Sequence, residues 1–461
     1  MAEQFDVVVL GGGPGGYAAA LYGGAAGLRV AVVEEQRVGG TCLHQGCIPA
    51  KELLQTAEVL RTVRGAKEFG VDAGEPVLDL HASQVRKQQV IDRLTKGVES
   101  LLKGREVTVL SGTGTIVDAA GHRVRVDDGT EVEGPALIIA TGSYPKSLPG
   151  LDFDGTRVLS SEHVLALEEV PPRVAIIGAG AIGCEFASML TDVGSEVTLL
   201  EALPQILPGI DADASEALVR AFRKRGIAAH AGVRVTSIEG TRELTIGFDG
   251  TDGTNNVTVD KVIVSVGRGP RTEGIGIEGS GVELDERGYI RVDEQMRTAV
   301  PGVYAVGDVV PTPQLAHVAF AEAIVAIKSI LGEPVTPIAY DKVPWGIYCH
   351  PEVGYAGLTE QQARDKGYDV VTSSHRFVGN GRALIIGEPD GIVKIVAERN
   401  GPVLGVHIVG PWATELMVEG YLAVNWEATP EEIGALIHPH PTLSELFGES
   451  ALAMTGRSLH G

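Results

Sequence analysis

Residues 5–16 read FDVVVLGGGPGG, a nearly apolar run that passes directly into six residues of glycine and proline. Such a run favours a buried parallel strand, and the alanine-rich stretch from about Tyr17 favours a helix. Residues 28–33 then read as a second strand that ends in Glu34. The glycine positions of GxGxxG are filled by Gly11, Gly13 and Gly16. GxGxxG alone is weak evidence, but strand, turn, helix, strand and terminal acid together predict a dinucleotide site.

The same arrangement recurs in residues 173–183, which read RVAIIGAGAIG. Its three glycine positions are filled by Gly178, Gly180 and Gly183, and a strand over residues 196–200 ends in Glu201. A carboxylate in that place accepts hydrogen bonds from a free ribose 2′-hydroxyl, which favours NAD over NADP. Two complete patterns predict two different dinucleotides in one chain.

Residues 39–51, GGTCLHQGCIPAK, hold Cys42 and Cys47, two of only four cysteines. In a regular helix, residues five apart rise about 7.5 Å, which exceeds the ~6.8 Å Cα separation that a disulfide tolerates. A bridge would therefore need a distorted turn, which Gly46 permits. A disulfide that closes so short a loop stabilises the fold little and is better suited to reversible reduction and oxidation. The other cysteines are isolated, which disfavours a metal site, so the pair alone fits a redox or a packing role equally.

Strand ends elsewhere carry further candidates. A buried strand over residues 136–140 ends in Thr141-Gly142-Ser143, and another over residues 262–266 ends in Gly267. A third ends at Gly307-Asp308, where the acid either binds a hydroxyl or caps a loop. Residues 334–344 are punctuated by proline and are predicted to form a linker.

The last part of the chain contains the stretch HPHPTLSE, residues 438–445. Here His440 and Glu445 suggest a positioned base and its orienting carboxylate. A surface turn is the plainer interpretation of these residues by themselves. Within the first predicted helix, Gly23 and Gly24 each cost about 1 kcal/mol against alanine, and the dinucleotide pattern does not account for them.

Composition bounds the class. A chain of 461 residues is expected to form about three domains. Its net charge, 38 − 60 = −22, disfavours nucleic acid and anionic membranes. No apolar run reaches the ~18 residues of a membrane span, and no targeting peptide is apparent. Few cysteines favour a reducing compartment, so we expect a bacterial-type cytoplasmic protein.

Together these motifs resemble the class I pyridine-nucleotide disulfide oxidoreductases over essentially the whole chain. The resemblance rests on Gly11–Gly16, Gly39–Lys51, Gly178–Phe186, Tyr304–Asp308 and His440–Glu445. Gly-Cys-Ile-Pro-x-Lys and His-Pro-Thr-Leu-Ser-Glu are most similar to the branch of the family that oxidises dihydrolipoyl groups. His44, Ala50, Val318 and Cys349 depart from the usual Asn, Ser, Lys and Thr, which leaves fine tuning open.

The resemblance implies an α/β fold with two Rossmann-like FAD/NAD(P)-binding domains, as in glutathione reductase, and a C-terminal α+β dimerisation domain. It places the FAD domain at residues 1–145 and 265–335, the NAD domain at 146–264 and the interface domain at 336–461. It implies a homodimer that serves a lipoylated acyltransferase or another lipoyl carrier, and a cis His440–Pro441 bond.

The resemblance also implies residue roles. The substrate thiolate would attack Cys42, Cys47 would face the flavin, and His440 of the other subunit would take the thiol proton. The catalytic set is Cys42, Cys47, His440, Glu445, Lys51 and Glu185, in which Glu445 holds the base and Lys51 pairs with Glu185 near the flavin. The FAD contacts are Gly11, Gly13, Pro14, Gly15, Gly16, Glu34, Gly40, Thr41, Lys51, Gly114, Thr141, Gly142, Ser143, Asp308, Leu315, Ala316 and His317. The NAD contacts are Gly178, Gly180, Ala181, Ile182, Gly183, Glu185, Glu201, Val235 and Gly267.

Two alternatives remain open at this point. One is another NAD(P)H-dependent disulfide or quinone reductase on the same scaffold. The other is a flavoprotein retained as a structural subunit of a multienzyme complex.

Overall fold

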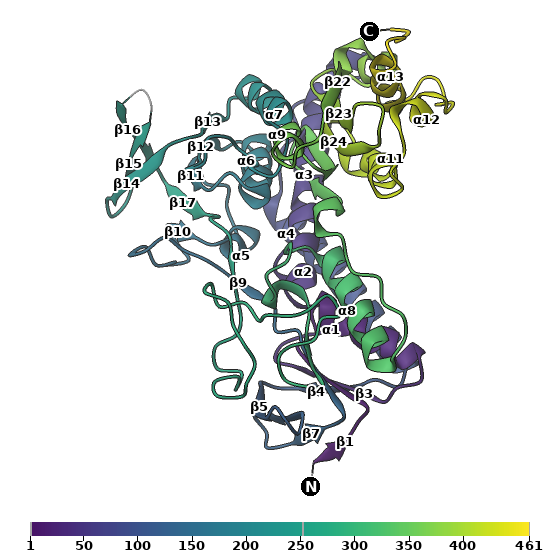
Figure 1. The fold of residues 1–461 in the computed structure, drawn as a ribbon. Coiled ribbons are helices and arrows are strands. Elements are labelled where there is room, and N and C mark those ends of the chain that lie inside the picture. The colour runs from purple at the N-terminus through teal and green to yellow at the C-terminus, as the bar shows by residue number, and fades with distance from the viewer. Residues whose placement is uncertain (1, 251–252, 461) are drawn as a thin grey trace. The chain divides into compact units, whose positions relative to one another are not determined.

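The computed structural model describes residues 2–250 and 253–460, and the chain divides into two compact units (Figure 1). Unit 1 comprises Met1–Leu53, His81–Lys146 and Gly267–Tyr340, and unit 2 comprises Leu54–Leu80, Ser147–Val266 and Asp341–Gly461. Each unit therefore joins stretches that are far apart in the sequence. The α/β class expected from the sequence is confirmed.

The centre of unit 1 is a five-stranded parallel sheet in the order β19-β8-β2-β3-β4. Its strands are β2 (Val7–Leu10), β3 (Val30–Glu34), β4 (Thr108–Ser111), β8 (Ala136–Ile139) and β19 (Val303–Ala305). Because the strands are parallel, the turns that follow β2, β8 and β19 leave from the same edge of the sheet. That edge therefore gathers the glycine turn after β2 and the residues that follow β8 and β19.

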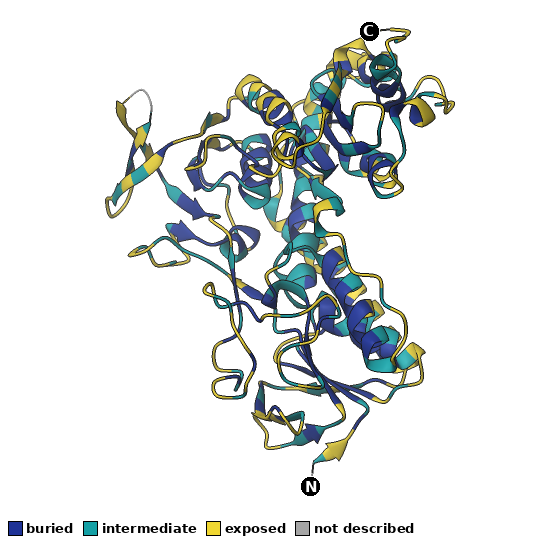
Figure 2. Ribbon diagram, in the orientation of Figure 1, coloured by how far each residue is buried: buried dark blue, intermediate teal, exposed yellow. Residues whose placement is uncertain are grey.

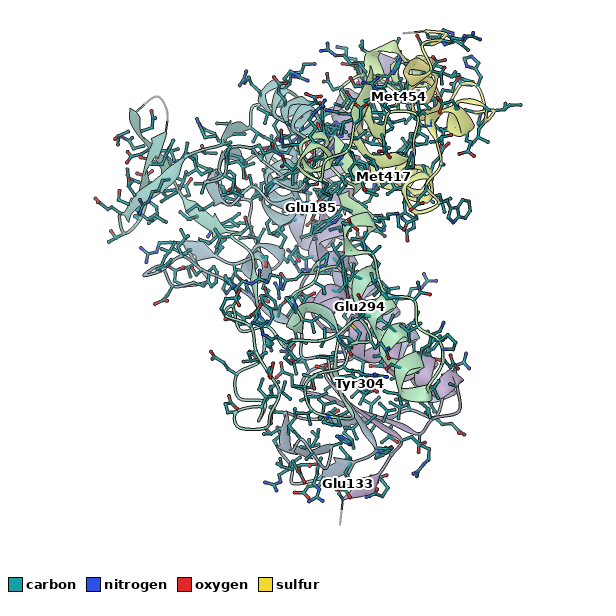
Figure 3. All side chains as sticks on the ribbon, viewed as in Figure 1. Glu133, Glu185, Glu294, Tyr304, Met417 and Met454 are labelled. Carbon is teal, nitrogen blue, oxygen red and sulfur yellow. The ribbon has the colours of Figure 1, made fainter. Side chains whose placement is uncertain are left out.

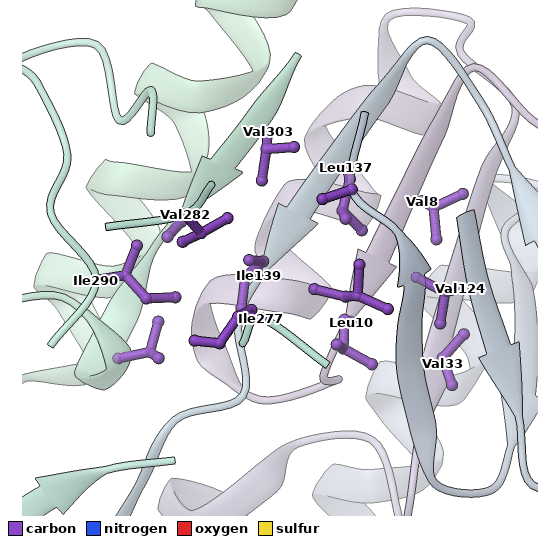
Figure 4. Packing of buried hydrophobic residues seen from close by; sticks show 14 of the residues in the cluster. Val8, Leu10, Val33, Val124, Leu137, Ile139, Ile277, Val282, Ile290 and Val303 are labelled. Atoms are coloured by element: carbon purple, nitrogen blue, oxygen red, sulfur yellow. The ribbon is translucent and has the colours of Figure 1, made fainter. Parts of the chain in front are cut away.

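Apolar side chains cover both faces of this sheet, as expected for buried parallel strands. On one face, Leu10 and Ile139 pack with Ile290, which comes from a distant loop (Figure 4). On the other face, helix α1 (Pro14–Ala25) runs beside α8 (Ala316–Leu331) (Figure 1).

The two unexplained glycines of α1 are explained by this packing. A Cβ on Gly23 would lie 3.3 Å from side-chain atoms of both Ile327 and Val30. A Cβ on Gly24 would lie 3.0 Å from the Cβ and carbonyl oxygen of Arg105. Their small size lets α1 approach its neighbours closely, which offsets their low helix propensity.

Smaller elements complete unit 1. A second sheet has the order β1-β7-β6-β5. Its strands are β1 (Glu3–Gln4), β5 (Gly114–Asp118), β6 (Arg123–Val126) and β7 (Glu131–Glu133). The remaining elements are β9 (Ser143–Pro145), which pairs with β18 (Arg268–Pro270), α2 (Gly40–His44) and η2 (Gly307–Val309). The short helix η3 (Tyr340–Lys342) begins at the last residue of unit 1. Helices α3 (Cys47–Gly65) and α4 (Leu80–Gly104) each span a boundary between the units, and η1 (Ala66–Phe69) follows α3.

The first part of unit 2 repeats the parallel design, with the strand order β10-β17-β11-β12-β13. The strands are β10 (Val158–Leu159), β11 (Arg173–Ile177), β12 (Glu196–Leu200), β13 (Ala228–His230) and β17 (Lys261–Val264). The helices are α5 (Ser161–Leu165), α6 (Ala181–Val193) and α7 (Ala212–Lys224). An antiparallel sheet of β14 (Arg234–Glu239), β15 (Leu244–Gly250) and β16 (Gly253–Val259) precedes β17.

The second part of unit 2 is an antiparallel sheet in the order β20-β21-β24-β23-β22. The strands are β20 (Trp345–Ile347), β21 (Glu352–Gly357), β22 (Val370–Arg376), β23 (Ile392–Glu398) and β24 (Val403–Gly410). The helical elements are α9 (Glu360–Asp365), η4 (Phe377–Gly379), α10 (Gly381–Ile385), α11 (Ala413–Asn425), α12 (Pro430–Gly434) and α13 (Glu445–Met454). The central strands are almost wholly buried (Figure 2).

A buried lysine joins the two parts of unit 2. Lys394 of β23 lies 2.8 Å from Asp211 and Glu360 and 2.6 Å from Asp213, and its side chain is 3% exposed. Burial alone would lower the pKa of Lys394, but the hydrogen bonds to three carboxylates raise it overall. Burial would raise the pKa of Asp211, and its bond to Lys394 and its other partners lower it instead.

Two local features of unit 2 carry no signal in the sequence analysis above. Helix α5 is short, and its start is fixed by a capping box between Ser160 and His163. The antiparallel sheet β14-β15-β16 was not expected from the sequence. In the described ranges, no helix combines the length and apolar character that a membrane crossing requires.

Candidate functional site

The first glycine turn in unit 1 requires its glycines. Gly11 has φ +103°, and a Cβ there would overlap the carbonyl oxygen of Ala140. A Cβ on Gly16 would overlap the carbonyl oxygen of Gly11, and one on Gly15 would lie 2.9 Å from a methyl group of Val306. Helix α1 begins at Pro14 without a side-chain cap, so its N-terminal N–H groups remain available to an anion.

Glu34 is tied directly to this turn. The N–H of Gly12 donates to Glu34 Oε2 at 2.6 Å, and the N–H of Gln36 donates to Oε1 at 2.9 Å. A cavity of about 620 Å³ is lined by Glu34, Gln36 and Arg37 with parts of α4 and β4, within the usual size range for ligand pockets. Turn, acid and cavity together fit the adenosine and pyrophosphate parts of a dinucleotide such as FAD.

The residues after β8 and β19 also meet. Ser143 Oγ donates to Asp308 Oδ2 at 2.6 Å, and Arg268 Nε donates to Ser143 Oγ at 2.7 Å. Burial raises the pKa of Asp308, although Ser143 and Arg268 partly oppose this. Thr141 Oγ1 donates to the carbonyl of Arg271 at 2.7 Å. Arg268 follows Gly267 at the end of a predicted strand. Its hydrogen bond to Ser143, which is far away in the sequence, could be found only from the three-dimensional structure.

Other predicted FAD contacts occupy distinct places. A Cβ on Gly40 would lie 2.6 Å from Gly13 Cα, so α2 begins against the glycine turn with Thr41 in its first turn. Leu315, Ala316 and His317 form the N-terminus of α8. A Cβ on Gly114 would overlap Leu10, so this glycine serves core packing.

Cys42 and Cys47 lie at a break between two helices. Helix α2 ends at His44, Gln45 has φ −137°, and α3 begins at Cys47, so the expected distortion is present. Both residues are partly buried, and no disulfide joins them in this structure. A hydrogen bond with Cys47, together with burial, raises the pKa of Cys42, whereas the charge of Lys51 acts in the opposite direction.

Two neighbours of the thiols had no assigned role in the sequence analysis. Burial, followed by the charges of Cys42 and Cys47, raises the pKa of Tyr17 to about 12. Tyr17 is the first residue of the predicted helix, and no sequence signal marked it as a site residue. His44, whose substitution for Asn was noted, places Nε2 2.9 Å from the carbonyl oxygen of Val38.

The second glycine turn, in unit 2, repeats the first. Gly178 has φ +101°, and its Cβ would lie 2.5 Å from the carbonyl oxygen of Ser265. A Cβ on Gly183 would overlap Gly178, whereas nothing lies within 4 Å of one on Gly180. The N–H of Ala179 donates to Glu201 Oε2 at 2.7 Å, and the N–H of Leu203 donates to Oε1 at 2.9 Å. Ala181 and Ile182 form the first turn of α6.

The remaining predicted NAD contacts lie on different elements of the chain. Glu185 lies on α6, 4% exposed, and accepts the N–H of Tyr348 at 3.0 Å (Figure 3). Val235 lies on β14 and packs against the core of the parallel sheet. Gly267 belongs to unit 1, where its carbonyl accepts the N–H of Lys146.

His440 and Glu445 form the expected pair in unit 2. His440 Nδ1 lies 2.8 Å from Glu445 Oε1, and Glu445 Oε2 accepts the N–H of Thr442 at 2.8 Å. Burial would raise the pKa of Glu445, but the bonds from Thr442 and His440 lower it overall. The His440 side chain is 79% exposed, and the predicted cis His440–Pro441 bond is confirmed. With Nδ1 bound to the carboxylate, Nε2 remains to accept a proton.

Across residues 2–250 and 253–460, no cluster of three or more His, Cys, Asp or Glu side chains is arranged to hold a metal ion.

Unit 1 contains the first dinucleotide turn and the thiol pair, and unit 2 contains the second turn and the histidine–carboxylate pair.

Known proteins with this organisation are numerous. The chain is 42% identical to a dihydrolipoyl dehydrogenase of Bacillus subtilis, with all of both chains covered. It is 41% identical to one of Corynebacterium glutamicum, again over both full lengths. Its fold matches the crystal structure of LpdA from Mycobacterium tuberculosis with a TM-score of 0.89 and 28% identity, covering 98% of this chain and 100% of the other. The fold also matches the HOCl-induced flavoprotein disulfide reductase RclA from Escherichia coli, with a TM-score of 0.85 and 26% sequence identity. That match covers 97% of this chain and 99% of the other.

Family profiles cover most of the chain. Residues 5–323 match the profile described as pyridine nucleotide-disulphide oxidoreductase. Residues 343–451 match the dimerisation domain of the same group. The chain therefore belongs to the pyridine nucleotide-disulphide oxidoreductase family.

Proposed function

We propose that the chain is an FAD-dependent dihydrolipoyl dehydrogenase, which oxidises dihydrolipoyl groups and reduces NAD⁺. The observation that carries the proposal is the adjacent Cys42 and Cys47 thiols beside the first dinucleotide turn, in a chain that also holds the His440–Glu445 pair. Full-length relatives named dihydrolipoyl dehydrogenase support the same substrate. When bound, FAD accepts two electrons from the dithiol and passes a hydride to NAD⁺.

The oxidising form of the site is a Cys42–Cys47 disulfide. A substrate thiolate attacks the sulfur of Cys42, which forms a mixed disulfide and releases Cys47 as a thiolate. The second substrate thiolate then attacks the substrate sulfur of that mixed disulfide and releases Cys42. The products are a cyclic substrate disulfide and the Cys42–Cys47 dithiol.

His440 supplies the base for these steps. Its Nε2 accepts the proton of the substrate thiol, while Glu445 holds Nδ1–H and stabilises the resulting imidazolium. The dimerisation-domain match supports a homodimer. Exposed apolar side chains such as Trp426, 77% exposed, and Ile437, 97% exposed, provide surface for that contact. We propose that each His440 serves the thiols of the other subunit.

The acceptor and partner follow from the same reasoning. Glu201 presents a carboxylate at the second turn, which favours NAD⁺ because a 2′-phosphate would be repelled. The natural substrate is proposed to be the lipoyl arm of an acyltransferase or another carrier protein. With only four cysteines, the chain suits the reducing cytoplasm.

The test is NAD⁺ reduction by free dihydrolipoamide, with reduction of glutathione disulfide and of quinones by NADH or NADPH measured in parallel. The proposal expects turnover with dihydrolipoamide and NAD⁺, little with NADP⁺, and bleaching of a visible flavin spectrum by the dithiol. A yellow protein that reduces glutathione disulfide or quinones instead would contradict the substrate. A protein that cannot be reconstituted with FAD would contradict the cofactor and the reaction.

A further inference from the structure

Helix α13 carries a second histidine–carboxylate pair beyond His440–Glu445. His460 Nδ1 lies 3.0 Å from Glu449 Oε1. Glu449 Oε2 also accepts the backbone N–H groups of Leu459, at 3.1 Å, and His460, at 3.3 Å. One carboxylate on the helix that ends at Met454 (labelled in Figure 3) therefore binds the C-terminal tail through three hydrogen bonds.

Apolar burial does not account for this attachment. The Leu459 residue is 74% exposed, and the His460 side chain is also 74% exposed, whereas the side chain of Glu449 is only 15% exposed. The tail thus rests on a half-buried charge rather than on an apolar surface. Charge-assisted hydrogen bonds of this kind are about twice as strong as neutral ones.

The two pairs are close enough to interact. Glu445 and Glu449 are four residues apart on α13, so their side chains emerge from the same face of the helix. The pKa of Glu445, which burial alone would raise, is lowered by Thr442, by His440 and also by the charge of His460. The charge on the tail therefore reaches the carboxylate that orients His440.

Other titratable groups also face this helix. His375 of β22 places Nδ1 3.2 Å from Ser450 Oγ, and its pKa is lowered by burial and only partly restored by the charge of Glu449. His438 packs against Gly448 and lies 2.8 Å from Glu419. Of these groups, His460 contributes a charge that lowers the pKa of Glu445.

We propose that His460 and Glu449 are positioning residues that set the pH at which His440 accepts the thiol proton. This inference rests on the proposed function of His440. When His460 is protonated, the charges of His460 and Glu449 cancel, and the charge nearest His440 is that of Glu445. Removing one partner leaves an uncompensated charge one helical turn away.

The sign of each change follows. His460→Gln leaves the negative charge of Glu449, which favours protonated His440 and moves the rise of kcat/KM with pH to higher pH. Glu449→Gln removes that negative charge, which moves the rise to lower pH. Each shift is expected to be at most about half a pH unit, since Glu445 and Glu449 are about 6 Å apart on the helix and two charges at that distance in water interact by roughly that much. The double variant should return to the wild-type midpoint.

The experiment measures the pH profile of kcat/KM for dihydrolipoamide on the holoenzyme in all four forms. Glu431→Gln, which removes an exposed acid from the neighbouring α12, is the matched control and should leave the midpoint unchanged. NADH oxidation by ferricyanide, which does not need the dithiol exchange, checks that each variant is an intact flavoprotein. A merely structural tail would shift both single variants in the same direction or neither, which would overturn the proposal.

A second measurement keeps the inference separate from the proposed function. The ring of His440 can be titrated by NMR with isotope-labelled histidine, and His440→Gln identifies its signal. Opposite shifts in His460→Gln and Glu449→Gln support the inference whatever the substrate proves to be. Unchanged titration overturns it even if dihydrolipoamide is turned over. Absence of dihydrolipoamide turnover in the wild type contradicts the proposed function alone.

Discussion

The two glycine turns have almost the same hydrogen bonds and quite different neighbours. Glu34 accepts two backbone N–H groups at 2.6 and 2.9 Å, and Glu201 accepts two at 2.7 and 2.9 Å. The first turn lies against Gly40, which opens the helix that carries Cys42. The second turn precedes α6, on which the buried Glu185 accepts a hydrogen bond from the backbone N–H of Tyr348. The comparison indicates that binding geometry is repeated, whereas the chemistry is set by what surrounds each turn.

The largest expected effect tests the thiols beside the first turn. Cys47→Ser removes the sulfur that completes the exchange, and dihydrolipoamide turnover should fall by about 10⁴-fold. NADH oxidation by ferricyanide should persist, because it needs both turns but not the thiols. Retained dithiol turnover would mean that the neighbourhood of the first turn does not determine the chemistry.

The next effect concerns the charge balance in unit 2. Lys394→Met leaves the buried carboxylate of Asp211 without its partner, so the unfolding free energy should fall by roughly 3–5 kcal/mol at pH 7. The pKa of Asp211 is lower in the folded than in the unfolded state. The ionised Asp211 therefore stabilises the fold at neutral pH, and this contribution is lost as the pH falls through the folded-state pKa. Urea unfolding at several pH values measures both effects.

Unit 1 should respond to acid in the opposite sense at one position. Burial raises the pKa of Glu322, which accepts the N–H of Gly307, to about 7. Its contribution is full below the unfolded pKa and is lost as pH rises through about 7. Hydrogen exchange on the wild type between pH 7 and pH 5 should therefore show α8 becoming more protected relative to β23. Equal weakening of both would contradict this assignment.

A matched glycine pair separates the two turns. Gly16→Ala and Gly183→Ala each introduce a Cβ that overlaps a backbone carbonyl, at a cost of about 1–3 kcal/mol. The first variant should lose flavin, and the second should keep flavin and dithiol reduction but lose NAD⁺ reduction. Gly97→Ala on the exposed side of α4, where nothing lies within 4 Å, is the control. Loss of flavin in Gly183→Ala would remove the distinction between the turns.

The smallest effect tests the acid of the second turn. Glu201→Gln replaces a carboxylate by a weaker acceptor, so NAD⁺ should bind about tenfold less tightly, while the flavin content stays unchanged. The Michaelis constants for NAD⁺ and NADP⁺ measure this, with Glu196→Gln at the exposed start of β12 as the control. An unchanged preference for NAD⁺ would place the selectivity elsewhere.

The sequence predicted the parts of the site that depend on local chain geometry. Gly11, Gly178 and their strand-end acids form a pattern within about 25 residues, because the turn and the two strands are consecutive. Tyr17 and Arg268 were not assigned roles. The interaction of Tyr17 with the thiols and the hydrogen bond of Arg268 to Ser143 join residues that are far apart in the sequence. Gly114 was predicted as an FAD contact, and the fold adds a packing requirement against Leu10 that no local pattern indicated.

The C-terminal region also shows that short patterns in the sequence do not specify contacts between separate elements. His440 and Glu445 are close in sequence, but the local stretch alone favoured a surface turn. The family resemblance implied the pairing, and the structure contains the hydrogen bond. The bond between Glu449 and His460 spans a helix end and a turn, which no short pattern specifies. The Lys394 cluster draws on three separate elements, and a lone lysine in a strand carries no sign of its partners.

The contact between Gly13 and Gly40 has a consequence for how this scaffold can change over generations. Because a methyl group at residue 40 would press on the Gly13 backbone, a side chain is sterically disfavoured there while the nucleotide turn keeps its present path. Substitutions in the two segments are thus coupled, although 26 residues separate them in the sequence printed above. A thiol cassette grafted from a distant homologue would function only if it carried its own glycine at this place, so the redox segment and the nucleotide turn should be inherited and engineered as one module.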